Sequence, residues 1–222
     1  MIMGNVSERR KQPPQVGVSV VILALGPVPQ SDVGAGAASS GMGSTLWMPL
    51  VKRVRQPFLG QWALPGGGLR ADHSLEQSAY AALESTTSLH PKYLEQLYTF
   101  GDPARSHGGL PMVSIVYWAL VGEADGRIDF AGGDNVKWFP VNHLPELAFD
   151  HRTIVEYAIN RLRGKIESPD IATRLVGERF TLSQLHDVYE AIAGQRIDLA
   201  NFRRKMLASG PVSYTHLTLP TN

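Results

Sequence analysis

Residues 62–89 have the sequence WALPGGGLRADHSLEQSAYAALESTTSL. Pro65 and the three glycines after it end a short strand at Leu64 and predict a tight turn. Ser74 is a good helix N-cap, and apolar residues recur after it at helical spacing, at Leu75, Ala79, Ala82 and Leu83. The stretch therefore predicts a strand, a glycine turn and a helix, and the fold is organised around it.

This loop and helix resemble the Nudix box, Gly-x5-Glu-x7-Arg-Glu-U-x-Glu-Glu-x-Gly-U, where U is aliphatic. The match runs from Gly67 to Leu89 without a gap. The glycines, the aliphatic positions and the helix are kept, but the carboxylates are not. The residues at the first glutamate, the Arg-Glu pair, the Glu-Glu pair and the last glycine are His73, Ala81, Ala82, Ser85, Thr86 and Ser88.

These substitutions bear directly on catalysis. Residues 82, 85 and 86 lie at i, i+3 and i+4 and so share one helix face. The resemblance implies that glutamates on this face hold a divalent metal against a diphosphate, and Mg²⁺ needs such oxygen ligands. We therefore expect no catalytic residue, no cofactor and no useful hydrolysis. His73 and His107 are possible metal ligands, but two histidines without a partner set do not favour a metal site.

Length and composition set the broad class. The 222 residues can form one large domain or a medium and a small one. The absence of cysteine excludes disulfides and thiolate catalysis and fits a cytoplasmic protein. No apolar run reaches the roughly 20 residues of a membrane helix. Arg9-Arg10-Lys11 before Val16–Leu25 resembles a secretory signal, but the β-branched residues of that stretch favour a strand.

The order of the remaining elements predicts an α/β fold, an α/β/α sandwich with a mixed sheet. A polar tail (1–15) precedes a buried strand (16–25), a flexible loop (26–44) and a strand (45–54) that closes a hairpin. Further strands are expected over 93–100, 112–121 and 136–140, with a loop over 101–109 and a helix over 151–163. We assign residues 16–165 to a Nudix-like ligand-sensing domain.

Several side chains near the glycines are candidates for binding a nucleotide diphosphate. Arginines are suited to phosphates, aromatic rings to an adenine, and a carboxylate to a ribose hydroxyl. The candidates are Arg53, Arg55, Arg105, Trp62, Phe100 and Asp102, together with the backbone of Gly66 and Gly67. For any one of them taken alone, a solvated arginine or a core aromatic is the favoured interpretation. Phe100-Gly-Asp-Pro-x-Arg105 also resembles a segment of ADP-ribose-type Nudix proteins.

The region after Pro169 predicts two short helices joined by a tight turn. Thr181 or Ser183 caps the first, Gly194 ends it, and Asp198 caps the second, Leu199–Ala208. Phe202, Met206 and Leu207 are expected to be buried. The remaining faces carry Asn201, Arg203, Arg204 and Lys205. This is the helix-turn-helix pattern, in which the second helix reads the major groove, although a helical hairpin with a solvated basic face fits equally well.

The order of the parts resembles the Nudix-related transcriptional regulators of the NrtR type, repressors of NAD biosynthesis genes. The motifs that carry it are Trp138-Phe-Pro, Leu144-Pro-x-Leu-Ala-Phe-Asp-His151, Arg179-Phe-Thr-Leu-x-x-Leu185 and Asn201-Phe-Arg-Arg-Lys205. The resemblance implies a homodimer that senses ADP-ribose or a related nucleotide and binds double-stranded operator DNA through Thr181, Ser183, Asn201 and the cations of the second helix.

The last residues depart from that family. Residues 166–210 fit a small winged-helix-like helical domain, but the wing is expected to follow where the chain has PVSYTHLTLPTN at 211–222. This segment resembles translated adapter sequence, so we expect a non-native tail, a truncated domain and weaker contacts to DNA phosphates.

Two other functions stay open. One is a Nudix hydrolase of a nucleoside diphosphate derivative such as ADP-ribose, which would need Mg²⁺. The other is a ligand-binding module that no longer binds DNA.

Overall fold

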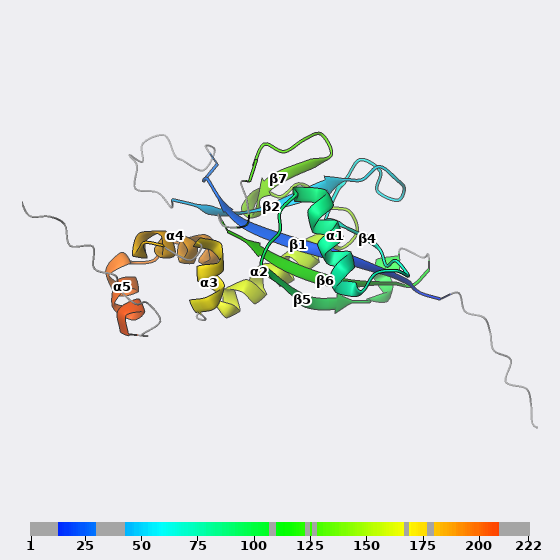
Figure 1. Cartoon of the computed structure of the whole chain (residues 1–222). Coiled ribbons are helices and arrows are strands. Elements are labelled where there is room, and N and C mark those ends of the chain that lie inside the picture. The colour runs from blue at the N-terminus through cyan, green and yellow to red at the C-terminus, as the bar shows by residue number, and fades with distance from the viewer. Residues whose placement is uncertain are drawn as a thin grey trace, which may run out of the picture.

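A computed structural model describes residues 13–29, 43–106, 110–122, 125, 128–166, 169–176 and 180–208 (Figure 1). Most of the predicted tails at 1–15 and 211–222, most of the loop 26–44, and His107 and Arg179 lie outside these residues. The strands are β1 (Gln15–Gly26), β2 (Thr45–Lys52), β3 (Trp62–Ala63), β4 (Gly66–Gly68), β5 (Tyr93–Phe100), β6 (Met112–Val121) and β7 (Val136–Pro140). The helices are α1 (Leu75–Thr87), α2 (His151–Lys165), α3 (Pro169–Val176), α4 (Leu182–Ala193) and α5 (Leu199–Ala208), with short 3-10 helices at η2 (Pro103–Ser106) and η4 (Val141–His143).

One mixed sheet holds the strands together. Its main order is β3-β2-β1-β6-β5, with β4 paired to β1 and β7 paired to β2. β1 and β6 are parallel along all of β6, from Gln15 opposite Met112 to Ala24 opposite Val121, and the other strand pairs are antiparallel. The predicted mixed sheet and the β1–β2 hairpin are thus confirmed.

Each face of the sheet is buried under a helix. Because side chains alternate along a strand, Val20 and Ile22 of β1 pack toward α1, whereas Val21 and Leu23 pack toward α2. α1 contributes Ala79 and Leu83 to the first core, and α2 contributes a stripe of apolar residues to the second, Ile154, Val155, Ala158, Ile159 and Leu162. The predicted α/β/α sandwich is therefore present.

The C-terminal helices share the second core. The buried cluster under α2 continues from Met48 and Leu50 of the sheet to Val188 and Ile192 of α4, and on to Phe202 of α5. In Figure 1, α3, α4 and α5 gather at one end of the sheet, beyond the end of α2. The helical unit is consequently packed onto the Nudix-like sandwich by apolar burial.

Two local predictions were wrong. The three glycines do not make a turn but form β4, which pairs with β1, and at Gly66 the backbone lies too close to β1 for a side chain. A Cβ on Gly66 would come within 2.4 Å of the Val18 carbonyl oxygen. Leu207 is 54% exposed, since the buried face of α5 is completed by Phe202 and Met206 alone.

The ends of the helices follow the predicted signals. Ser74 caps α1 through a reciprocal capping box with Gln77, and Thr181 caps α4 in the same way with Gln184. Gly194 ends α4 in the left-handed conformation with φ of 70°. Among the described residues, no helix has both the length and the apolarity to cross a membrane.

Candidate functional site: a ligand cleft and a basic helical unit

A cleft of about 710 Å³ opens beside the glycine strand β4. Its walls come from β4, the first residues of β1, the loop after β2, the start of β6 and the start of α2. Five of the predicted ligand residues line it, and they are Arg53, Arg55, Gly66, Gly67 and Arg105. The volume lies within the usual range for small-molecule sites.

Arg53 is held in place on the cleft wall by its own loop. Its Nε donates to the Pro57 carbonyl oxygen at 2.8 Å, and its guanidinium lies 4.5 Å from the ring centroid of Phe149. Phe149 has a φ of 56°, which is uncommon for a bulky residue, and Phe58 contacts its ring edge-on. Partial burial lowers the pKa of Arg53, but an arginine stays charged. The cleft therefore presents a cation whose position is already set.

Arg105 lies deeper and is only 5% exposed. Its Nη1 donates to the Phe100 carbonyl oxygen at 2.8 Å, and its Nη2 donates to Ser114 Oγ at 2.9 Å. Its Nε is 3.1 Å from Asp150 Oδ2, an ion pair whose angle is too poor for a hydrogen bond. The guanidinium thus ties η2, β6 and the residue before α2 together, so its contacts in this structure are structural, and its role as a phosphate ligand stays a prediction.

His151, the first residue of α2, also lines the cleft. It was not among the ligand residues predicted from the sequence. The residue is 7% exposed, and its Nδ1 accepts a hydrogen bond from the Leu64 amide at 3.0 Å. Because Nδ1 is the acceptor, the proton of the neutral ring is on Nε2. Burial first, then Arg105 and Arg53, lower the pKa of His151 to about 3. The ring is a neutral donor beside two cations.

Three predicted ligand residues do not line the cleft. Trp62 packs edge-on against Phe139 at 5.1 Å, and its carbonyl oxygen accepts from the Ala148 amide. Phe100 lies in a ring cluster with Tyr98 and Tyr157. Asp102 accepts from the Ala104 amide at 2.8 Å and so shapes the loop itself. These three residues therefore lie outside the lining of the cleft, which their spacing in the sequence did not reveal.

A smaller hollow of about 200 Å³ lies on the other side of β4, against α1. This is where the Nudix-box positions come together, and its walls include Val18, Arg70, His73, Ala82 and Ser85. None of its lining residues is a carboxylate. Ser85 Oγ and Thr86 Oγ1 both donate back to the Ala82 carbonyl oxygen, at 3.0 and 2.7 Å.

The nearby Asp72 does not compensate for the missing glutamates. Its carboxylate is bonded to Arg70 through two hydrogen bonds and lies 2.9 Å from His73 Nδ1. These partners hold the pKa of Asp72 well below its usual range, with the Arg70 hydrogen bond as the largest cause. The hollow therefore does not fit the divalent metal that a Nudix fold implies.

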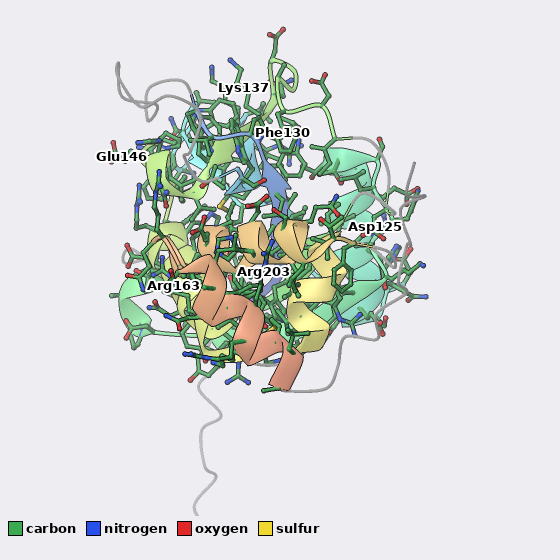
Figure 2. All side chains as sticks on the ribbon, turned by 90° about the vertical axis from the view of Figure 1, so that its left-hand side faces the viewer. Asp125, Phe130, Lys137, Glu146, Arg163 and Arg203 are labelled. Atoms are coloured by element: carbon green, nitrogen blue, oxygen red, sulfur yellow. The ribbon has the colours of Figure 1, made fainter. Side chains whose placement is uncertain are left out.

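The second region of interest is α4, the turn after it and α5. Thr181 is the N-cap of α4, and Ser183 in the first turn is exposed. On α5 the predicted DNA-binding residues are all exposed, namely Asn201, Arg203, Arg204 and Lys205. Arg204 Nη2 donates to Asn201 Oδ1 at 2.7 Å. Figure 2 looks onto this end of the molecule and shows Arg203 on the outward side of α5.

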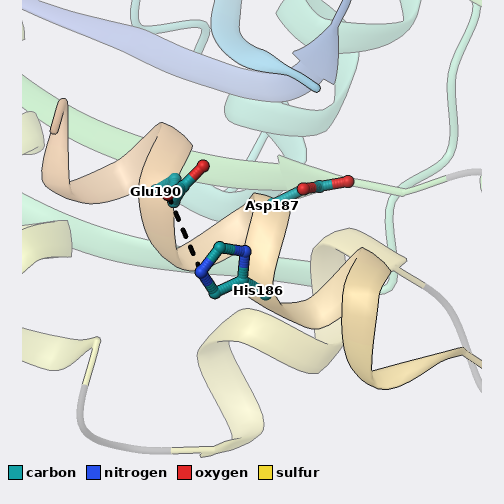
Figure 3. A group of neighbouring side chains, drawn as sticks. All are labelled: His186, Asp187 and Glu190. Atoms are coloured by element: carbon teal, nitrogen blue, oxygen red, sulfur yellow. Dashed lines mark ion pairs between the residues drawn. The ribbon is translucent and has the colours of Figure 1, made fainter. Parts of the chain in front are cut away.

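A clamp of two buried polar residues sets the geometry of the turn. Glu190 Oε1 accepts from the Ile197 amide at 2.8 Å, and His186 Nε2 donates to the Ile197 carbonyl oxygen at 2.8 Å. Figure 3 shows the two side chains on α4, with His186 Nε2 3.7 Å from Glu190 Oε1. The His186 ring also contacts Phe202 of α5. His186 and Glu190 were missed by sequence reasoning, although a histidine and a glutamate spaced i, i+4 on the apolar face of a helix were a usable signal.

Asp187 adds a third potential metal ligand beside His186 and Glu190. The ligand atoms of His186, Asp187 and Glu190 all lie within 4.8 Å of one another, a spacing that a metal ion could accept. However, the clamp already uses His186 Nε2 and one oxygen of Glu190 on the two polar groups of Ile197. We therefore interpret the group as a structural fastening of the turn.

Comparison with known proteins agrees with this architecture. Residues 35–158 match the NUDIX domain, and residues 172–218 match the NrtR DNA-binding winged helix domain. The "ADPR responsive transcriptional repressor NtrR" of Acinetobacter baylyi is 31% identical over 170 residues, which cover 75% of this chain and 68% of that protein.

Two solved structures of Shewanella oneidensis NrtR are also similar. The complex with a 27mer DNA has a TM-score of 0.67 at 30% identity and covers 91% of this chain and 89% of that chain. The NUDIX domain complexed with ADP ribose has a TM-score of 0.50 at 33% identity and covers 68% of this chain and 90% of that chain. With a NUDIX domain, a winged helix match and a relative similar across both, the chain belongs to the NrtR family of Nudix-related transcriptional regulators.

Proposed function

We propose that this chain is a transcriptional repressor of NAD metabolism genes whose Nudix domain binds ADP-ribose or a closely related nucleotide without hydrolysing it. The observation that carries the proposal is the contrast across β4. The cleft keeps Arg53 fixed beside the neutral donor His151, whereas the Nudix-box hollow is lined without any carboxylate. A diphosphate can therefore be held by side-chain cations, but no metal is provided to activate a water.

The second half of the proposal concerns DNA. Asn201, Arg203, Arg204 and Lys205 are all exposed on α5. A cation-rich helix of a helix-turn-helix unit suits the major groove, where arginine and asparagine can meet base edges and the other cations meet phosphates. The relative that is solved with a 27mer DNA and the relative named for its response to ADPR support the pairing of these two activities.

Ligand binding must shift the protein away from its DNA-binding arrangement. This requires that ADP-ribose bind the DNA-incompetent arrangement more tightly, because equal affinity for both would change nothing. We expect the repressor to act as a homodimer, which would match two DNA half-sites.

The test has two stages. Calorimetric titration with ADP-ribose, in buffer with Mg²⁺ and in buffer with EDTA, is followed by analysis of the nucleotide in the same sample. We expect binding in both buffers and an intact ligand. Operator binding, measured on a duplex selected by the protein from a random library, should then weaken on addition of ADP-ribose. Unchanged DNA binding at saturating ADP-ribose would contradict the repressor proposal.

A weak Nudix hydrolase is the second candidate, favoured by the match of residues 35–158 to the NUDIX domain. It requires Mg²⁺- or Mn²⁺-dependent release of a nucleoside monophosphate in the first stage of the same experiment. Such turnover would place the hydrolase ahead of the sensor.

A further inference from the structure

The helix α2 joins the ligand cleft to the DNA-binding unit. At its first residue, His151 accepts the Leu64 amide inside the cleft. Near its last turn, Arg163 Nε donates to the Ile192 carbonyl oxygen of α4 at 3.0 Å. At 1.5 Å per residue these two contacts are roughly 18 Å apart along one rigid helix. A displacement of α2 at the cleft therefore also displaces Arg163 relative to α4.

The acceptor of Arg163 lies at a helix end that needs a donor. Ile192 is in the last turn of α4, where carbonyl groups lack helical amide partners and the helix dipole favours a cation. The close approach also depends on Gly194, because a Cβ there would lie 3.1 Å from Arg163 Nη2. Arg163 thus makes a directional contact to the C-terminal end of α4.

The position of α5 depends on this end of α4. The clamp of His186 and Glu190 on Ile197 fastens the turn to α4, and Phe202 of α5 packs on the His186 ring. Among the described residues, α4 also packs on the core under α2 through apolar side chains, and Asp187 lies beside Gly43. Apolar contacts have no fixed direction, so they tolerate a shift of α4. The hydrogen bond of Arg163 is directional, so it can be made in one arrangement and lost in another.

We propose that Arg163 is the positioning residue that couples occupation of the cleft to the orientation of α4 and α5. The inference rests on the proposed function and names the contact that carries its regulation. Ligand binding moves the start of α2, the Arg163–Ile192 contact is made or broken at the other end, and the exposed cations of α5 are turned toward or away from DNA.

The experiment compares the 222-residue chain with Arg163→Ala, Arg163→Lys and Arg161→Ala. Arg161 lies on the same helix, is exposed, and its replacement removes the same charge, so it is a matched control. For each protein, the Kd for the selected duplex is measured with and without saturating ADP-ribose, and the ratio of the two values is the coupling factor. The Kd for ADP-ribose and the melting temperature are measured in parallel.

We expect a coupling factor of about tenfold or more in the wild type and in Arg161→Ala, within the usual range for linked sites. In Arg163→Ala it should fall to less than about threefold, with Arg163→Lys intermediate and with the Kd for ADP-ribose alone changed by less than about twofold. A merely structural role would change DNA affinity equally with and without ligand and leave the factor unaltered.

Two failures can be told apart. If the wild type shows no ligand effect on DNA, the proposed function fails and the inference falls with it. If the wild type responds and Arg163→Ala responds to the same extent, the proposed function stands and the assignment of Arg163 is overturned.

Discussion

The large cleft and the small hollow on either side of the glycine strand β4 differ in whether their polar groups are available to a ligand. In the large cleft, Arg53 and the Nε2–H of His151 sit on the wall of a site of about 710 Å³. In the small hollow against α1, Ser85 donates to its own helix, as does the neighbouring Thr86, and Asp72 outside the hollow is bonded to Arg70 and His73. Under the proposed function, binding and hydrolysis depend on separate surfaces, and one can be kept when the other is lost.

The largest expected effect concerns the floor of the cleft. Arg105→Ala leaves the Asp150 carboxylate, the Ser114 hydroxyl and the Phe100 carbonyl without the guanidinium that joins them. Breaking a buried pair on one side is costly, so the free energy of unfolding should fall by about 3 kcal/mol. Urea denaturation measures it. Arg55→Ala, at an exposed position on the same cleft, should leave the midpoint nearly unchanged; an equal loss there would contradict the structural role of Arg105.

The second effect is on stability against pH. His151 has a folded pKa of about 3, below its unfolded value near 6.5, so the unfolded chain binds more protons between these pH values. Stability from this group is full above pH 6.5 and is lost as the pH falls toward 3, with a slope of at most about 1.4 kcal/mol per pH unit.

His151→Asn isolates this contribution, because an asparagine oxygen can accept the Leu64 amide but does not titrate. We expect urea midpoints of the variant to depend less steeply on pH from 6.5 downward than those of the wild type. Parallel slopes for the two proteins would show that His151 is protonated without penalty.

The third effect tests the cleft as a binding surface. Arg53→Ala removes a cation that is already oriented by Pro57 and Phe149. A hydrogen bond to a charged group contributes about 1.5–3 kcal/mol, so the Kd for ADP-ribose should rise about 10- to 100-fold by calorimetry. Arg161→Ala removes the same charge far along α2 and serves as the control. Wild-type affinity in Arg53→Ala would exclude this wall as the phosphate site.

The smallest effect is expected at the small hollow against α1. Adding EDTA should change the Kd for ADP-ribose by less than about twofold, because no carboxylate lines the hollow to bring a metal to the ligand.

A variant that combines Ala82→Glu, Ser85→Glu and Thr86→Glu should instead gain Mn²⁺ binding, measured by titration. Metal-dependent affinity in the wild type would remove the contrast between the two hollows.

The sequence alone determined the parts that depend on neighbours along the chain. The caps Ser74, Thr181 and Gly194 act within a few residues, and the alternation of Val20, Val21 and Ile22 assigns side chains to opposite faces of β1. The loss of the Nudix-box glutamates is likewise visible at fixed spacing on one helix face. These features need no knowledge of what lies across the molecule.

Tertiary structure decided which of the chemically suitable residues meet. Arg105 and Asp150 come together only because η2 and the start of α2 border the same cleft, and His151 faces the Leu64 amide 87 positions away in sequence. Trp62 and Phe100 have the chemistry of adenine-stacking residues, yet they pack against other rings. Contacts between distant segments depend on how sheet and helices pack, and spacing along the chain carries no information about that packing.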